Sequence, residues 1–125
     1  MTDDGQQLLY RTVSTADAPG SGATTTLWAS NTNGGSAEQG ARYKRLIINV
    51  YSSHASAASG LQIDESEDGT SWDNLVSYSV SATTYTKNYV SVGAPFLRVR
   101  YVNSANVITT WRIGILGDQN ERASQ

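Results

Sequence analysis

The sequence predicts an all-β fold, a single antiparallel β-sandwich of about eight strands. Short runs rich in Val, Ile, Thr, Tyr and Trp alternate with turns rich in Gly, Asn, Asp and Ser along the 125 residues. Within several runs apolar and polar residues alternate, which gives each strand one apolar face that a second sheet must cover. The periodicity of an amphipathic helix is hard to find anywhere in the chain.

We expect strands at residues 8–13, 24–29, 43–51, 60–64, 72–80, 84–92, 96–103 and 107–116. Eight short strands with turns at this spacing are typical of an antiparallel sandwich, and a jelly roll is the preferred form. Alternation does not encode connectivity, so an immunoglobulin-like strand order also remains open.

Alternation is clearest in the runs 43–51, 96–103 and 107–116. Their predicted core side consists of Leu46, Ile48, Val50, Leu97, Val99, Tyr101, Val107, Thr109, Trp111, Ile113 and Ile115. Their opposite side carries Arg45, Ile47, Asn49, Tyr51, Arg98, Arg100 and Val102. We expect Val99, Tyr101, Trp111 and Ile113 to seal the core. Pro95 precedes a strand, where its missing N–H group is tolerated.

A chain of this length makes one domain with a sufficient core. We predict a flexible N-terminal arm at residues 1–22, the sandwich at 23–117 and a solvated C-terminal tail at 118–125, with a further flexible loop at 30–40. There are no cysteines, which excludes disulfides and thiolate metal ligands.

The net charge is −2 and no run of Lys or Arg occurs, so we expect no nucleic-acid partner. The start of the chain lacks the basic and apolar regions of a secretory signal. No apolar run approaches the roughly 20 residues of a membrane span. We therefore expect a soluble protein made in the cytoplasm, without a membrane partner.

The stretch 61–75, LQIDESEDGTSWDNL, holds five of the eleven acidic residues and Trp72. An Asp-Gly pair between two strand-like runs is a strong hairpin signal, because Gly accepts a positive φ and Asp tolerates it. We interpret the stretch as a hairpin with its turn at Asp68 and Gly69, and expect Trp72 to cap the core beside it.

A calcium site is the competing interpretation. Asp64, Ser66 and Asp68 fall at alternate positions before Gly69, like the opening of an EF-hand loop. The pattern then fails, because Leu75 stands where a bidentate Glu is required and no helices flank the loop. We expect no metal and no cofactor, with these three residues as the only candidate calcium ligands.

No catalytic constellation is visible, and we expect no enzyme. The single histidine, His54, lies in a Ser/Ala-rich stretch that is typical of a surface loop, and no Gly-x-Ser-x-Gly nucleophile turn occurs. Tyr85, Lys87 and Tyr89 share one face of a predicted strand. An exposed row of this kind is typical of a partner-contact patch or a sugar platform.

The C-terminal two-thirds of the chain, residues 45–117, resembles small β-sandwich virion proteins of tailed bacteriophages. In that type a DGxxW hairpin is followed by an R-V-R-Y-type strand that pairs with a final apolar strand. The matching positions are Asp68, Gly69, Trp72, Phe96, Arg98, Val99, Arg100, Tyr101, Asn103, Trp111 and Ile113.

The resemblance implies a capsid decoration or cement protein that binds the major capsid protein on the surface of the virion. It also implies a homo-oligomer, with a trimer favoured. One alternative is a carbohydrate- or receptor-binding module of a phage fibre or tail that uses Tyr85, Tyr89 and the acidic turn. Another is a different structural position in the particle, such as the neck or the base of a head fibre.

Overall fold

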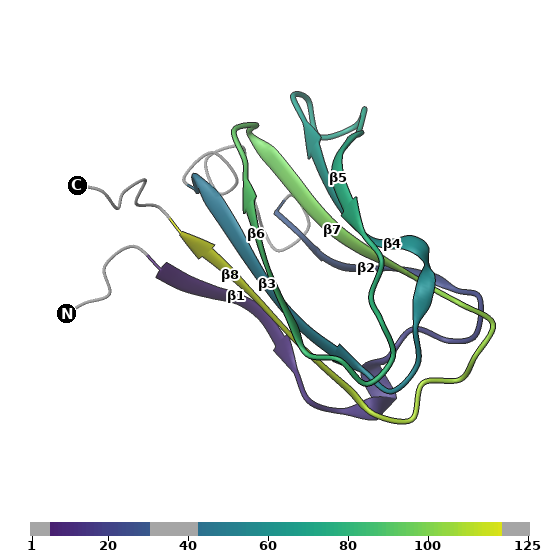
Figure 1. Ribbon diagram of the computed structural model, residues 1–125. Helices are drawn as coiled ribbons and strands as arrows, with labels where there is room; N and C mark the ends of the chain where they lie inside the picture. Colours follow the sequence, from purple (N-terminus) through teal and green to yellow (C-terminus); the bar gives the residue numbers. More distant parts are fainter. Residues whose placement is uncertain (1–5, 31–42, 119–125) are drawn as a thin grey trace.

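The computed structural model describes residues 6–30 and 43–118, which form eight β-strands and one short 3-10 helix. In chain order these are β1 Gln6–Thr12, η1 Thr15–Asp17, β2 Thr24–Ala29, β3 Arg45–Ser52, β4 Ser56–Ser66, β5 Asp73–Tyr78, β6 Thr86–Ser91, β7 Phe96–Asn103 and β8 Trp111–Asp118 (Figure 1). The predicted all-β fold is confirmed, and each predicted strand overlaps one observed strand.

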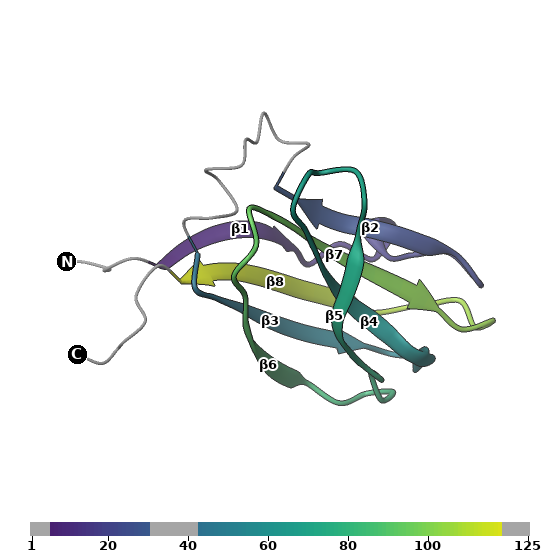
Figure 2. The ribbon, with the colours of Figure 1, turned by 90° about the horizontal axis from the view of Figure 1, so that it is seen from above.

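The strands form two four-stranded antiparallel sheets that pack as a sandwich (Figure 2). Sheet A has the order β1-β8-β3-β6, and sheet B has the order β2-β7-β4-β5. Hydrogen-bonded neighbours include β1–β8, β2–β7, β3–β6 and β4–β5, so these pairs are nested around the connection from β4 to β5. We keep the jelly-roll connectivity as our interpretation of this nested order.

The core lies between the sheets and is built from the inward-facing residues of both. Its buried members are Leu27, Trp28, Tyr43, Leu46, Ile48, Val50, Leu61, Ile63, Val80, Val90, Val92, Leu97, Val99, Tyr101, Ile108, Trp111, Ile113 and Ile115. The four residues expected to seal the core all belong to this cluster. The rings of Tyr101 in sheet B and Trp111 in sheet A meet edge to face, with their centroids 4.9 Å apart, which is a favourable aromatic geometry.

The prediction of a flexible arm at residues 1–22 is wrong for the described part of that range. β1 pairs with β8 from Gln6 opposite Asp118 to Thr12 opposite Ile113. Further along, the Asn103 side chain donates hydrogen bonds to the carbonyl groups of Pro19 and Gly20. Gly and Ser residues near the end of this range indicated flexibility, but the pairing of β1 with β8 and the hydrogen bonds from Asn103 hold the backbone of this segment against the sandwich. Residues 1–5 and the predicted loop from 31 onward lie outside the described residues.

The start of β4 and both ends of β8 also differ from prediction. β4 starts at Ser56, inside a stretch predicted as a connection, because Ser56 pairs with Asn103 of β7, and an irregularity in register separates this pair from Leu61, which pairs with Tyr101. β8 starts at Trp111, not at 107, and Val107 is 68% exposed. Asp118, placed in the C-terminal tail, is the last residue of β8 and is buried; residues 119–125 lie outside the described part.

Candidate functional site

The acidic turn joins β4 to β5 and is organised by its own side chains. The Ser66 hydroxyl accepts hydrogen bonds from the backbone N–H groups of Asp68 and Gly69, at 3.2 and 2.8 Å. Oδ1 of Asp68 accepts from the N–H groups of Thr70 and Ser71, at 2.8 and 2.7 Å. Gly69 has φ +80°, the left-handed conformation expected for the glycine of this turn. The hairpin prediction is confirmed.

Protonation of Asp68 is expected to loosen this turn. The N–H groups of Ser71 and Thr70 and the Ser66 hydroxyl lower the pKa of Asp68 from 3.8 to about 2. Because the folded-state pKa is depressed, the stabilisation is present above about pH 4 and is lost as the pH falls towards 2.

Urea unfolding of the wild type and Asp68→Asn between pH 5 and pH 2 measures this effect. The stability difference between the two proteins should stay constant above about pH 4 and shrink below it. A difference that persists unchanged to pH 2 contradicts the assignment.

Asp64 does not face the turn. Its side chain is 1% exposed, and its Oδ2 accepts hydrogen bonds from Nε of Arg98 at 2.9 Å and Nε of Arg100 at 2.6 Å. Its Oδ1 accepts from the Asn74 amide at 3.0 Å. A cation at Asp64 would therefore have to displace two guanidinium groups. Within residues 6–30 and 43–118, no group of three or more His, Asp or Glu residues is placed to hold a metal ion.

Trp72 does not cap the core, which corrects that expectation. Its ring lies under the guanidinium of Arg98, 4.3 Å from the ring centroid, on the outer side of sheet B. A planar guanidinium stacks well on an indole, so Trp72 orders the arginine that pairs with Asp64.

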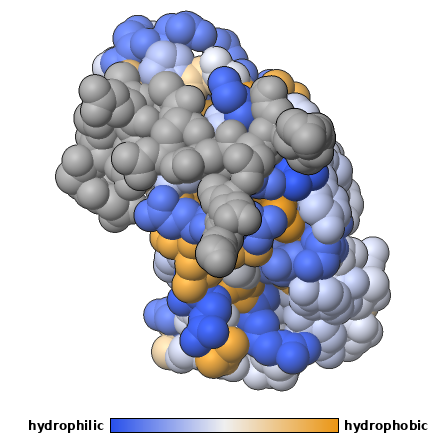
Figure 3. All heavy atoms as spheres, turned by 90° about the vertical axis from the view of Figure 1, so that its left-hand side faces the viewer, coloured by the Kyte–Doolittle hydropathy of each residue, from blue (hydrophilic) through white to orange (hydrophobic). Residues whose placement is uncertain are grey.

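The outward side chains of sheet A, which we call the sheet A face, include an apolar row. Leu8 pairs with Leu116, Leu116 with Ile47, and Ile47 with Tyr89, so one such residue from each of β1, β8, β3 and β6 lies in register. Leu8 and Tyr89 are each 54% exposed. Ile47 is only 4% exposed, yet it does not belong to the core cluster. Figure 3, viewed from this side, shows apolar surface between hydrophilic patches.

Cations flank this apolar row. The four strands of sheet A carry Arg11, Arg45, Lys87 and Arg112, and their only acidic residue is Asp118. Asp118 forms a 2.6 Å ion pair with Arg45. Four positive groups against one carboxylate give these strands a net charge of +3, in a chain whose net charge is −2. The sheet A face is therefore locally basic.

Two arginines of this face are stacked on tyrosines. The Arg45 guanidinium lies 5.3 Å from the centroid of the Tyr89 ring, and the Arg112 guanidinium lies 4.5 Å from that of Tyr51. A cation–π contact of this kind restrains the guanidinium and so reduces the side-chain entropy lost on binding. Nε of Arg45 is buried and has no hydrogen-bond partner among the described residues.

The three predicted partner-contact residues lie at the edge of this face. Tyr85 precedes β6, and Lys87 and Tyr89 lie on it at alternate positions; all three are exposed. Sequence reasoning found this row but missed the apolar row that crosses it. The available signal was the apolar Ile47, which stands at a position of β3 where alternation predicts a solvent-facing residue.

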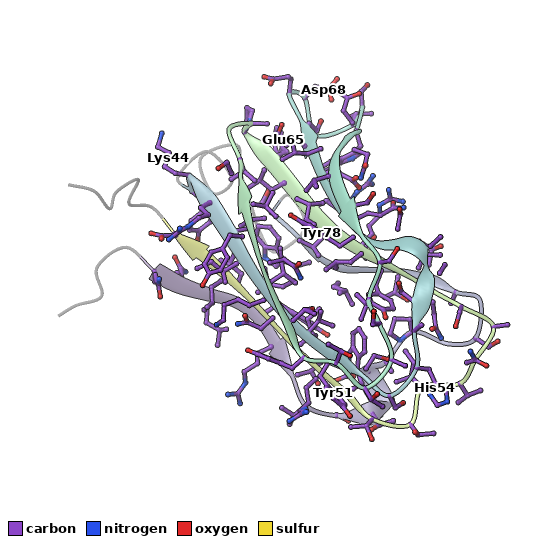
Figure 4. The ribbon with its side chains drawn as sticks, viewed as in Figure 1. Lys44, Tyr51, His54, Glu65, Asp68 and Tyr78 are labelled. Carbon is purple, nitrogen blue, oxygen red and sulfur yellow. The ribbon has the colours of Figure 1, made fainter. Side chains whose placement is uncertain are left out.

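His54 lies at the end of the sandwich opposite Asp68 (Figure 4). Its Nδ1 is 2.9 Å from the hydroxyl of Ser53. That hydroxyl also accepts hydrogen bonds from the backbone N–H groups of Thr109 and Thr110, so it fastens the loop after β3 to the loop before β8. The geometry of Ser53 and His54 is that of a structural contact.

No helix of the described chain has the length and apolar character needed to cross a membrane.

No curated protein matches the chain. Among solved structures, the crystal structure of the PBSX exported protein XepA matches with a TM-score of 0.69 and 15% identity, over 96% of this chain and 39% of that chain. The likeness shows a shared fold, and the chain spans about two-fifths of the length of that protein. The family model described as "Uncharacterised protein YqxG N-terminal domain" matches residues 11–113. This match covers most of the chain, which therefore belongs to the YqxG N-terminal domain family.

Proposed function

We propose that the protein is a non-enzymatic structural protein of a phage particle, a capsid decoration or cement protein that binds the shell of major capsid protein. The observation that carries the proposal is the sheet A face, where a four-strand apolar row is flanked by ordered cations. An apolar centre with a polar, charged rim is the usual anatomy of a protein–protein interface. The fold shared with the PBSX exported protein XepA supports the proposal of a phage-related protein.

The size of the face fits a partner that is present in many copies. Four strands about 4.8 Å apart and up to eight residues long make a face of at most roughly 19 by 27 Å. A single contact of that size lies at the weak end of specific interfaces. A repeating shell compensates by holding many copies, and a homo-oligomer, for which we favour a trimer, strengthens binding through multivalency. The protein would then lie on the capsid surface after synthesis in the host cytoplasm.

Export away from the particle is the second candidate, because the solved structure with the same fold is described as an exported protein. A carbohydrate-binding role for Tyr85 and Tyr89 has less support. The Arg45 guanidinium already lies against one side of the Tyr89 ring, so only the other side could stack on a sugar.

Fractionation of a phage lysate on a density gradient distinguishes these roles. We expect the protein to sediment with intact particles, in a fixed ratio to the major capsid protein. Particles from a strain lacking the gene should lose integrity at a lower temperature than wild-type particles. Recovery of the protein only in the particle-free supernatant would instead favour export, and equally robust particles without it would rule out a cement role.

A further inference from the structure

We propose that the sheet A face is the surface applied to the shell, and that it takes an acidic protein surface with an apolar centre. This inference rests on the proposed function and deepens it, since it names both the face and the chemistry of its partner. The first argument is charge: the strands of this face carry a net +3. The complementary surface must therefore present carboxylates around an apolar patch.

The charge of the molecule is divided between its two sheets. The strands of sheet B and the turn between β4 and β5 carry two arginines and five acidic residues, Asp64, Glu65, Glu67, Asp68 and Asp73. An acidic shell would repel this side and attract the sheet A face. Charge thus fixes the orientation in which the protein approaches its partner.

Three of those five acids are already engaged within their own molecule. Asp64 is paired with two arginines, Oε2 of Glu65 accepts from the N–H of Gly93 at 2.8 Å, and Asp68 accepts from its own turn. These three carboxylates are therefore poorly placed to pair with the basic sheet A face of a second copy of the chain. A separate acidic protein is therefore the better partner for this face.

The type of cation also indicates a protein partner. Arg112 is exposed and lies over the Tyr51 ring, and its planar guanidinium can bind a carboxylate of the partner through two parallel hydrogen bonds, whereas Arg45 is already paired with Asp118. Arginine and tyrosine are enriched among the residues that contribute most of the binding energy at protein interfaces. A site for a simple polyanion would not need Leu8, Leu116 and Ile47 between its cations.

Co-sedimentation with particles prepared from a gene-deletion strain tests the inference. Wild-type protein is re-added and compared with Lys87→Glu/Arg112→Glu, which reverses two exposed charges of the face. The matched control, Glu67→Lys/Asp73→Lys, reverses two exposed charges on the other side. We expect the face variant to bind about 100-fold more weakly than wild type and the control to bind at least as well. Wild-type binding should weaken between 50 and 500 mM salt.

Two further variants and two further readouts, nuclease treatment and the oligomeric state, keep the test decisive. The neutral Lys87→Gln/Arg112→Gln and the apolar-row variant Leu8→Ser should each show intermediate binding while melting like the wild type. Full binding by the face variant overturns the inference and leaves the proposed function intact. Failure of wild-type protein to bind the particles overturns both. Binding that disappears after nuclease treatment of the particles, or a face variant that merely dissociates a wild-type oligomer, overturns the acidic protein partner.

Discussion

Replacement of Asp64 with alanine is expected to lower the free energy of unfolding by about 3 kcal/mol. The carboxylate is buried and receives hydrogen bonds from Arg98, Arg100 and Asn74. Removal of one member of a buried ion network leaves its partners without compensation, which costs about 3–5 kcal/mol. The side chains of Arg98 and Arg100 are 23% and 26% exposed and so regain some hydration. This places the expected loss at the lower end of the range.

Urea unfolding at pH 7 measures the loss, with Asp73→Ala as the matched control. Asp73 is an exposed acid on β5, and its replacement should change stability by less than about 0.5 kcal/mol. Asp64→Asn keeps an acceptor for the arginines, and we expect it to lose less than Asp64→Ala. A loss below about 1 kcal/mol for Asp64→Ala would mean that the arginines do not depend on this carboxylate.

The same ion network predicts a dependence on pH. Burial alone would raise the pKa of Asp64, but hydrogen bonds from Arg100, Asn74 and Arg98, and the charge of Arg100, outweigh it and lower the pKa below 3.8. The stabilisation from Asp64 is therefore present above about pH 4 and is lost as the pH falls through the folded-state value. The wild type should lose more stability on acidification than Asp64→Asn.

Most of the fold could be predicted from the sequence because its strands carry local signals. β2 and β7 have the predicted bounds, since β-branched or aromatic residues fill them and turn residues or Pro95 flank them. The start of β4 was predicted wrongly because its first residues carry no local strand signal. Its first residues are Ser and Ala, and only the distant partner Asn103 on β7 recruits Ser56 into the ladder.

The candidate site was less predictable, because it depends on register between strands far apart in sequence. Alternation alone placed Tyr85, Lys87 and Tyr89 on one face. It could not show that Leu8 and Leu116 align with Ile47, since that alignment follows from the pairing of β1, β8 and β3. The role of Asp64 was hidden in the same way, because its arginine partners lie on β7, more than thirty residues later.

Replacement of Trp111 with alanine is expected to lower the free energy of unfolding by about 4 kcal/mol. The side chain is fully buried and lies edge to face with Tyr101 of the opposite sheet, so truncation opens a cavity at the contact between the two layers. A domain of this size is stable by only about 5–15 kcal/mol, so the variant should melt far below the wild type. Calorimetry with Leu75→Ala as the control measures the loss, because Leu75 is an apolar residue that is 42% exposed.

The next residue along β8 gives the opposite expectation. Arg112 points outward, where it stacks on Tyr51, and its replacement by glutamate should cost less than about 1 kcal/mol of stability. It should nevertheless weaken binding to the shell, whereas the folded fraction of Trp111→Ala should bind like the wild type. Successive residues of a strand face opposite sides of a sheet, so residue 111 belongs to the core and residue 112 to the interface. Equal effects of the two substitutions on both stability and binding would contradict this division.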